Sequence, residues 1–159
     1  MNNLKIIYLV GLPGSGKSTY LIDNGMTNNS SYVIISNDLE LEVECQKQGK
    51  TYSELWGKFP FSEIKKRCRQ KFENAIKNKI PTIIIDNTNM TRKSRRIYLS
   101  SEYKREAIVF TTSRQEIEQR LKKRNLTGKV ISNEVLDRME KSFEPIDKIN
   151  ENFSKVSYI

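Results

Sequence analysis

Residues 4–18, Leu4-Lys5-Ile6-Ile7-Tyr8-Leu9-Val10-Gly11-Leu12-Pro13-Gly14-Ser15-Gly16-Lys17-Ser18, decide the fold of this protein. The stretch 4–10 is a mostly apolar run with the length of a buried strand, and residues 16–24 can form a helix. The turn between them matches the spacing G-x-x-x-x-G-K-[ST], which is typical of a phosphate-binding loop placed between a strand and a helix. The sequence therefore predicts an α/β fold that binds a nucleotide through its phosphates.

Each part of this loop has a chemical role toward a nucleoside triphosphate. Glycines allow backbone amides to turn toward phosphate oxygens, and the N-terminus of the following helix adds positive potential. Lys17 is expected to reach the β- and γ-phosphates, and Ser18 to offer its oxygen to Mg²⁺. The loop residues of the predicted ATP site are Gly11, Leu12, Pro13, Gly14, Ser15, Gly16, Lys17, Ser18 and Thr19.

Strands and helices are expected to alternate along the rest of the chain. Helices are predicted at 62–79, capped by Ser62, at 91–103, capped by Thr91, at 113–125 and at 132–145, and further strands at 32–35, 81–85, 107–111 and 155–159. This alternation favours right-handed crossovers and a parallel sheet covered on both faces. The length of 159 residues matches one domain, residues 1–159, with a central sheet of four to five strands.

The composition excludes several classes of function. Because the chain has no histidine, it can form no Ser-His-Asp triad and no histidine metal site, so acid–base chemistry falls to carboxylates. The longest apolar run, 6–10, is too short to cross a membrane. The N-terminus lacks a signal-peptide pattern and only Cys45 and Cys68 are present, so we expect a cytoplasmic protein. The net charge of +9 favours a polyanion partner but also fits a well-solvated surface.

Two aspartates follow predicted strands. Asp86 directly follows the strand 81–85, at its carboxyl end, where a carboxylate can hold the Mg²⁺ shell beside the phosphate loop. Asp38 lies just beyond the strand 32–35, at the edge where a parallel sheet receives its ligand. A carboxylate there can accept the proton of an attacking hydroxyl, although an aspartate in this position is also a common helix cap.

The combined motifs resemble the 5′-polynucleotide kinase group of P-loop kinases. Besides the loop, the resemblance rests on Ile35-Ser36-Asn37-Asp38, Asp86-Asn87-Thr88-Asn89, Arg120…Arg124-Asn125, Ile131-Ser132 and Phe143-Glu144-Pro145, and it spans nearly the whole chain. It implies a kinase-like P-loop NTPase fold, a three-layer sandwich with a helical lid at about 120–132. The implied activity is phosphorylation of a DNA or RNA 5′-hydroxyl by Mg·ATP, as in nucleic acid repair, with Asp38 as general base.

The resemblance also implies roles for single residues. Arg124 is the lid residue expected to contact the transferring phosphoryl group, with Arg120 and Lys129 as helpers at the ATP. The implied acceptor site consists of Asp38, Thr88, Asn89, Arg92, Ile131 and Ser132. Two positions depart from the group: Leu41 stands where an arginine often binds an acceptor phosphate, and Ser132 where proline is usual.

Two other classes of function remain open. A kinase of a nucleoside, nucleotide or sugar would share the loop, Asp38 and the lid, whereas a nucleic-acid-binding ATPase would need neither Asp38 nor the lid. The charge and the basic helix 62–79 favour a polynucleotide, held partly by Lys65, Lys66 and Arg92, Arg95 or Arg96. An Asn-Lys-x-Asp guanine signature and an Asp-x-Asp phosphatase motif are both missing from the sequence.

Overall fold

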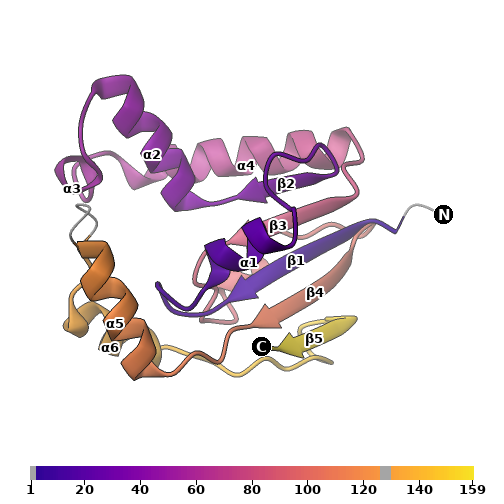
Figure 1. The fold of residues 1–159 in the computed structure, drawn as a ribbon. Helices are drawn as coiled ribbons and strands as arrows, with labels where there is room; N and C mark the ends of the chain where they lie inside the picture. Colours follow the sequence, from indigo (N-terminus) through magenta and orange to yellow (C-terminus); the bar gives the residue numbers. More distant parts are fainter. Residues whose placement is uncertain (1–2, 126–129) are drawn as a thin grey trace.

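The computed structural model describes residues 3–125 and 130–159, which form one parallel five-stranded sheet flanked by helices (Figure 1). The strand order is β2-β3-β1-β4-β5. The strands are β1 (Lys5–Val10), β2 (Tyr32–Ile35), β3 (Thr82–Asp86), β4 (Lys104–Val109) and β5 (Lys155–Tyr158). The helices are α1 (Lys17–Asp23), α2 (Asn37–Gln48), α3 (Tyr52–Leu55), α4 (Phe61–Lys77), the 3₁₀ turn η1 (Ser94–Arg96), α5 (Arg114–Asn125) and α6 (Asn133–Lys141). The predicted α/β class and parallel sheet are confirmed.

Crossover handedness distributes the helices over the two faces. The connection from β1 to β2 runs toward one edge of the sheet, and the three later connections run back toward the other edge. Because crossovers between parallel strands are right-handed, α1 covers one face and the later helices cover the opposite face. In agreement, Leu21 of α1 packs with Ile7 and Ile84, and α4 packs on the other face; Figure 1 shows α1 in front of the strands and α4 behind them.

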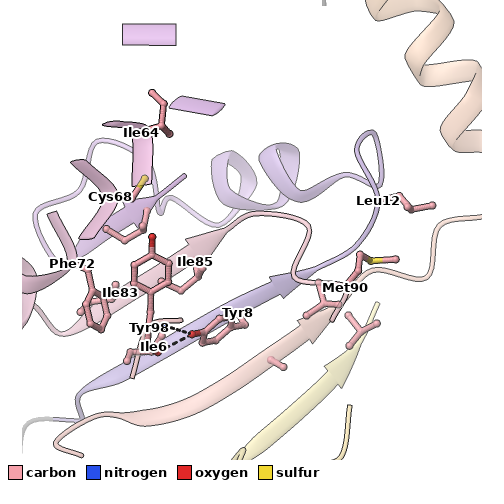
Figure 2. Packing of buried hydrophobic residues seen from close by; sticks show 14 of the residues in the cluster. Ile6, Tyr8, Leu12, Ile64, Cys68, Phe72, Ile83, Ile85, Met90 and Tyr98 are labelled. Atoms are coloured by element: carbon pink, nitrogen blue, oxygen red, sulfur yellow. Dashed lines mark hydrogen bonds between the residues drawn. The ribbon is translucent and has the colours of Figure 1, made fainter. Parts of the chain in front are cut away.

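The larger core lies between the sheet and α4 (Figure 2). Alternate strand residues such as Ile6 and Tyr8 point toward Cys68 and Phe72 of α4, as the four-residue spacing of the helix predicts. The Tyr8 hydroxyl donates to the carbonyl of Tyr98 at 2.7 Å and accepts from the Tyr98 N–H at 3.1 Å, so this buried phenol is satisfied. Burial raises the pKa of Cys68 to about 11, so its thiol is a neutral part of the core.

The prediction of a helix at 91–103 is wrong, because the structure has only the short 3₁₀ turn η1 there. Arg95 in this turn is fully buried and forms an ion pair with Glu151, Nε to Oε1 2.7 Å. Its guanidinium also donates to the carbonyls of Asn89 and Glu144. These long-range partners fix the segment against the C-terminal part of the chain, which local helix signals cannot anticipate. Arg95 is therefore unavailable as a surface contact for a polynucleotide.

Other boundaries also differ from the predictions. Helix α4 begins at Phe61 after Pro60 and has no side-chain cap, so Ser62 is not its cap. Helix α6 ends at Lys141, before Phe143. Helices α2 and α3 were not anticipated, because the acidic sequence of α2 has only a weak apolar face, with Leu41 and Cys45 buried. No helix in the described ranges is long and apolar enough to cross a bilayer.

Candidate active site

The phosphate loop has the backbone conformation that only glycine adopts easily. Gly14 and Gly16 have φ angles of +79° and +102°, and Gly16 is the N-cap of α1. A side chain at Gly14 would also crowd Leu121 of α5. The loop is tied to its surroundings by bonds from the Gly11 N–H to the Thr88 carbonyl, 3.0 Å, and from Thr112 Oγ1 to the Ser15 carbonyl, 2.7 Å.

The polar groups of the loop fit an anionic ligand. Lys17 Nζ donates to the carbonyls of Gly11 and Leu12 at 2.8 and 3.0 Å, which holds the ammonium within the loop. The hydroxyl of Ser15 is buried and has no hydrogen-bond partner among the described residues. A buried donor of this kind at the start of a helix suits a phosphate oxygen.

A cavity of about 1100 Å³ opens over the loop. Its lining comes from the loop, from the ends of β2, β3 and β4, and from α2, α3, α5 and α6. The volume is at the upper end of the range for small-molecule sites, so it has room for a donor and an acceptor. Of the predicted site residues, the cavity is lined by Pro13, Gly14, Ser15, Gly16, Lys17, Ser18, Thr19, Asp38, Asp86, Thr88, Arg120, Arg124, Ile131 and Ser132.

Two oxygen-bearing residues of the lining fit a magnesium ion. Ser18 is the second residue of α1, and Asp86 ends β3 next to β1, where it pairs in register with Leu9. Mg²⁺ prefers oxygen ligands and is commonly held by one or two protein groups together with substrate phosphates. In the part of the chain that the structure describes, no group of three or more acidic, histidine or cysteine side chains forms a metal site by itself. Ser18 and Asp86 are therefore the residues that would hold the ion.

Asp38 lies in the first turn of α2 and lines the cavity. The cap of this helix is Ser36, whose Oγ accepts from the Leu39 N–H, so Asp38 is not the cap. The turn is anchored to the loop after β3, because the Asn37 N–H donates to Asn87 Oδ1 at 3.0 Å. The hydroxyl of Tyr52 donates to Asp38 Oδ1 at 2.8 Å. The carboxylate is thus held in a fixed orientation at the end of β2.

Helix α5 brings two arginines to the cavity. Ile117 and Leu121 are buried as predicted and anchor the helix, which leaves Arg120 and Arg124 on the cavity side. Arg120 Nη1 donates to the Gly14 carbonyl at 3.2 Å, and this guanidinium also pairs with Glu116. Lys129 lies outside the described residues. Ser132 is the N-cap of α6, and its Oγ accepts a hydrogen bond from the Val135 N–H.

The structure does not bring every predicted residue to the cavity. Asn89 is 2% exposed, and its Nδ2 donates to the carbonyls of Leu9 and Ile85, which is a structural role. Arg92 does not line the cavity; it forms an ion pair with Asp147, with 4.0 Å between Nη2 and Oδ2. Gly11 and Leu12 are not among the residues that line the cavity, but their carbonyls accept hydrogen bonds from Lys17 Nζ within the loop.

Sequence reasoning missed the wall formed by α2, α3 and the start of α4. This wall contributes Asn37, Leu39, Glu42, Tyr52, Ser53, Trp56 and Phe61 to the lining. One signal was available: Thr51 and Glu54 form a capping box, which marks the start of a helix in the sequence. That signal predicts α3 but not the direction in which its aromatic side chains point.

Solved structures with the same fold include a chain of an RNA repair complex, a sugar kinase and a protein in complex with ADP-AlF3. A chain of the Pnkp1/Rnl/Hen1 RNA repair complex is 22% identical with a TM-score of 0.66, over 89% of this chain and 44% of that chain. A sugar kinase from Janibacter sp. HTCC2649 is 16% identical with a TM-score of 0.58, over 98% and 85%. Kti12 of Chaetomium thermophilum in complex with ADP-AlF3 is 16% identical with a TM-score of 0.60, over 97% and 88%. The present chain thus spans less than half of the RNA repair protein that it matches.

The match to a family of sequences extends through most of the chain. The model of the family described as AAA domain matches residues 6–146, from β1 to the segment after α6. This range contains the phosphate loop, Asp38, Asp86 and the described part of the segment predicted to form a lid. The chain therefore belongs to the AAA domain family.

Proposed function

We propose that this protein is an ATP-dependent kinase that transfers the γ-phosphoryl group of Mg·ATP to the 5′-hydroxyl of a polynucleotide. The proposal is carried by one observation: the Asp38 carboxylate and the phosphate loop line the same cavity, together with Arg124 of α5. A general base, a phosphate cradle and a lid cation are the parts that phosphoryl transfer requires.

The proposed reaction assigns each group one task. The acceptor oxygen bonds to the γ-phosphorus, the bond from this phosphorus to the bridging oxygen breaks, and ADP leaves with that oxygen. The proton of the hydroxyl passes to Asp38, and Arg124 stabilises the negative charge on the transferring group. Ser18 and Asp86 would hold Mg²⁺, which would supply positive charge to neutralise the phosphates.

Two findings support a nucleic acid as the acceptor. The chain carries a net charge of +9, which favours association with polyanions. The fold is shared with a chain of an RNA repair complex. Of the proposed basic contacts, all except Arg95 are exposed in the structure, namely Lys65, Lys66, Arg92 and Arg96.

A small-molecule kinase is the second candidate, and one feature of α2 favours it. Leu41, at the position of the expected phosphate-binding arginine, is buried in the core. The cavity side of the same helix instead presents Glu42 beside Asp38. A negative charge at this place disfavours a close acceptor phosphate.

The decisive experiment offers labelled ATP to the protein with a 5′-hydroxyl oligonucleotide, with a nucleoside and sugar mixture, or with water alone. Label on the oligonucleotide, at a higher kcat/KM than on any small molecule, is the expected result. Preferred labelling of a small molecule would establish the second candidate. Phosphate release without any labelled acceptor would instead show an ATPase.

A further inference from the structure

Helix α3 and its C-cap residue present two aromatic rings to the cavity, the partly buried ring of Tyr52 and the exposed ring of Trp56. The rings of Tyr52 and Trp56 are stacked, with centroids 5.5 Å apart and an interplanar angle of 18°. The capping box of Thr51 and Glu54 fixes the short helix that carries them. Trp56 is 61% exposed although it lines the cavity, so its large ring contributes little to the core. An exposed indole held rigidly in a binding site is suited to stacking on a flat ligand.

Tyr52 links this pair to the proposed general base. Its hydroxyl donates to Asp38 Oδ1 at 2.8 Å, while its ring packs on Trp56. Burial and the neighbouring Asp38 carboxylate raise the pKa of the Tyr52 phenol, so the hydroxyl stays protonated and keeps donating. The base and the exposed indole are therefore separated by a single tyrosine side chain.

The charge of this wall indicates what kind of group it can bind. Among the described residues that line the cavity, those from α2, α3 and the first turn of α4 include Asp38 and Glu42 but no lysine or arginine. Phosphates gain little from such a surface, whereas an uncharged aromatic group can stack on it without an electrostatic cost. Phe61 adds another half-exposed ring to the same wall.

We propose that Trp56, supported by Tyr52, is the stacking surface for the nucleobase of the acceptor nucleotide whose 5′-hydroxyl faces Asp38. This inference rests on the proposed polynucleotide kinase function and names how the acceptor is recognised. Within one nucleotide the ribose separates the 5′-hydroxyl from the base, just as Tyr52 separates Asp38 from Trp56 in the wall. Recognition then depends on the terminal base more than on phosphate contacts.

The test compares two acceptors with the same number of phosphates. One is an ordinary 5′-hydroxyl oligonucleotide, and the other has an abasic residue at its 5′ end. The wild-type protein is expected to prefer the ordinary oligonucleotide by about 5- to 150-fold in kcat/KM, the range of one base–aromatic stack. Trp56→Ala should abolish this preference through a higher KM for the ordinary acceptor, and Trp56→Phe should retain part of it.

Two further variants separate stacking from positioning and from nonspecific effects. Tyr52→Phe keeps the ring but removes the donor to Asp38, so it should lower kcat and leave the preference for a terminal base in place. Tyr158→Ala is the matched control, because Tyr158 is 64% exposed and lies outside the cavity lining. This control should change neither the activity nor the preference.

The outcomes distinguish the stacking surface from the function on which it rests. If Trp56→Ala phosphorylates both oligonucleotides with the wild-type ratio, the stacking surface is wrong and the kinase function stands. If Tyr52→Phe has the wild-type kcat, Tyr52 does not position the base. If the wild-type protein phosphorylates neither oligonucleotide but does phosphorylate a small molecule, the proposed function fails, and the stacking proposal fails with it.

Discussion

The two halves of the cavity are built in different ways. The half over the phosphate loop, proposed to bind the phosphoryl donor and called the donor half, consists mainly of backbone, with Gly14 and Gly16 in left-handed conformations and Lys17 held inside. The half formed by α2, α3 and the start of α4, proposed to bind the acceptor and called the acceptor half, consists of side chains, with the carboxylate of Asp38 and the ring of Trp56 as its main features. The donor half is cationic, and the acceptor half is acidic and aromatic.

This difference explains why the two halves carry different amounts of information about function. Backbone amides bind any phosphate chain, so the donor half indicates a nucleoside triphosphate and nothing about the acceptor. We expect specificity for the acceptor to come from side chains that line the cavity, those of α2, α3 and α4 among them. The comparison therefore predicts that substitutions in the two halves impair different steps.

The largest expected effect separates Lys17 from Asp38. Lys17→Ala should reduce both transfer and background ATP hydrolysis, by about 10³-fold, because the ammonium serves phosphate binding and transition-state charge. Asp38→Ala should reduce transfer by about 10²- to 10⁴-fold, the usual contribution of a general base, and leave ATP affinity nearly unchanged. Single-turnover kinetics and ATP titration measure the two quantities.

Asp38→Asn is the matched control for this comparison, because the amide keeps an oxygen that can accept from Tyr52 while losing the basic group. Equal losses of ATP affinity in the Lys17 and Asp38 variants would place Asp38 in the donor half or in the fold.

The next effect concerns the support that the halves share. Arg95 donates to the carbonyl of Asn89 in the loop after β3 and pairs with the buried Glu151. Glu151→Gln should destabilise the protein by about 3–5 kcal/mol, because it leaves a buried guanidinium without its charged partner. Urea unfolding measures this loss, and ATP binding by the folded variant should be retained.

The same pair has a pH dependence of known sign. Burial raises the pKa of Glu151, but the hydrogen bonds and charge of Arg95 lower it more, so the pKa lies below the usual range. The ionised Glu151 therefore stabilises the folded protein at pH values above the usual pKa range of a glutamate. This stabilisation is lost as the pH falls through the pKa that Glu151 has in the folded protein. The wild-type protein and Glu151→Gln should converge in stability at low pH; a gap that widens there would contradict the assignment.

Arg124 tests the border between the halves. Because its proposed contact with the γ-phosphoryl group strengthens in the transition state, Arg124→Ala should lower kcat and kcat/KM together, by about 10²- to 10³-fold. The KM for ATP should change little. Turnover within about twofold of the wild-type value would remove Arg124 from the site, and Arg120→Ala would then be measured in the same assay.

The smallest effect is the salt dependence of the acceptor. With roughly two or three phosphate contacts, the log–log slope of apparent oligonucleotide affinity against salt should be about −1.5 to −2. A nucleoside, which has no phosphate, should show almost no slope. The measurement is KM between low and physiological salt at fixed Mg·ATP. A slope several times steeper would contradict an acceptor half that is poor in cations.

Much of the donor half was predictable because its signals are local. The strand before the loop, the glycines, and the positions of Ser18 and Asp86 follow from residue order and spacing, and the structure agrees with each. The buried residues Ile117 and Leu121 likewise follow from helical periodicity. The helix prediction for 91–103 was wrong because its structure depends on a distant contact: Arg95 pairs with Glu151, 56 residues away in sequence.

The sequence by itself determined that the chain forms a parallel α/β fold with a phosphate loop, since a strand, a glycine turn and a helix are consecutive in the chain. The tertiary structure alone decided that Tyr52 bonds to Asp38, that Trp56 faces the cavity and that Arg95 is buried. The physical reason is that these contacts join separate elements, and their geometry depends on how the helices pack against the sheet. The conformation of the phosphate loop follows from neighbours in sequence, whereas the wall of α2, α3 and α4 depends on contacts between elements that are separate in the chain.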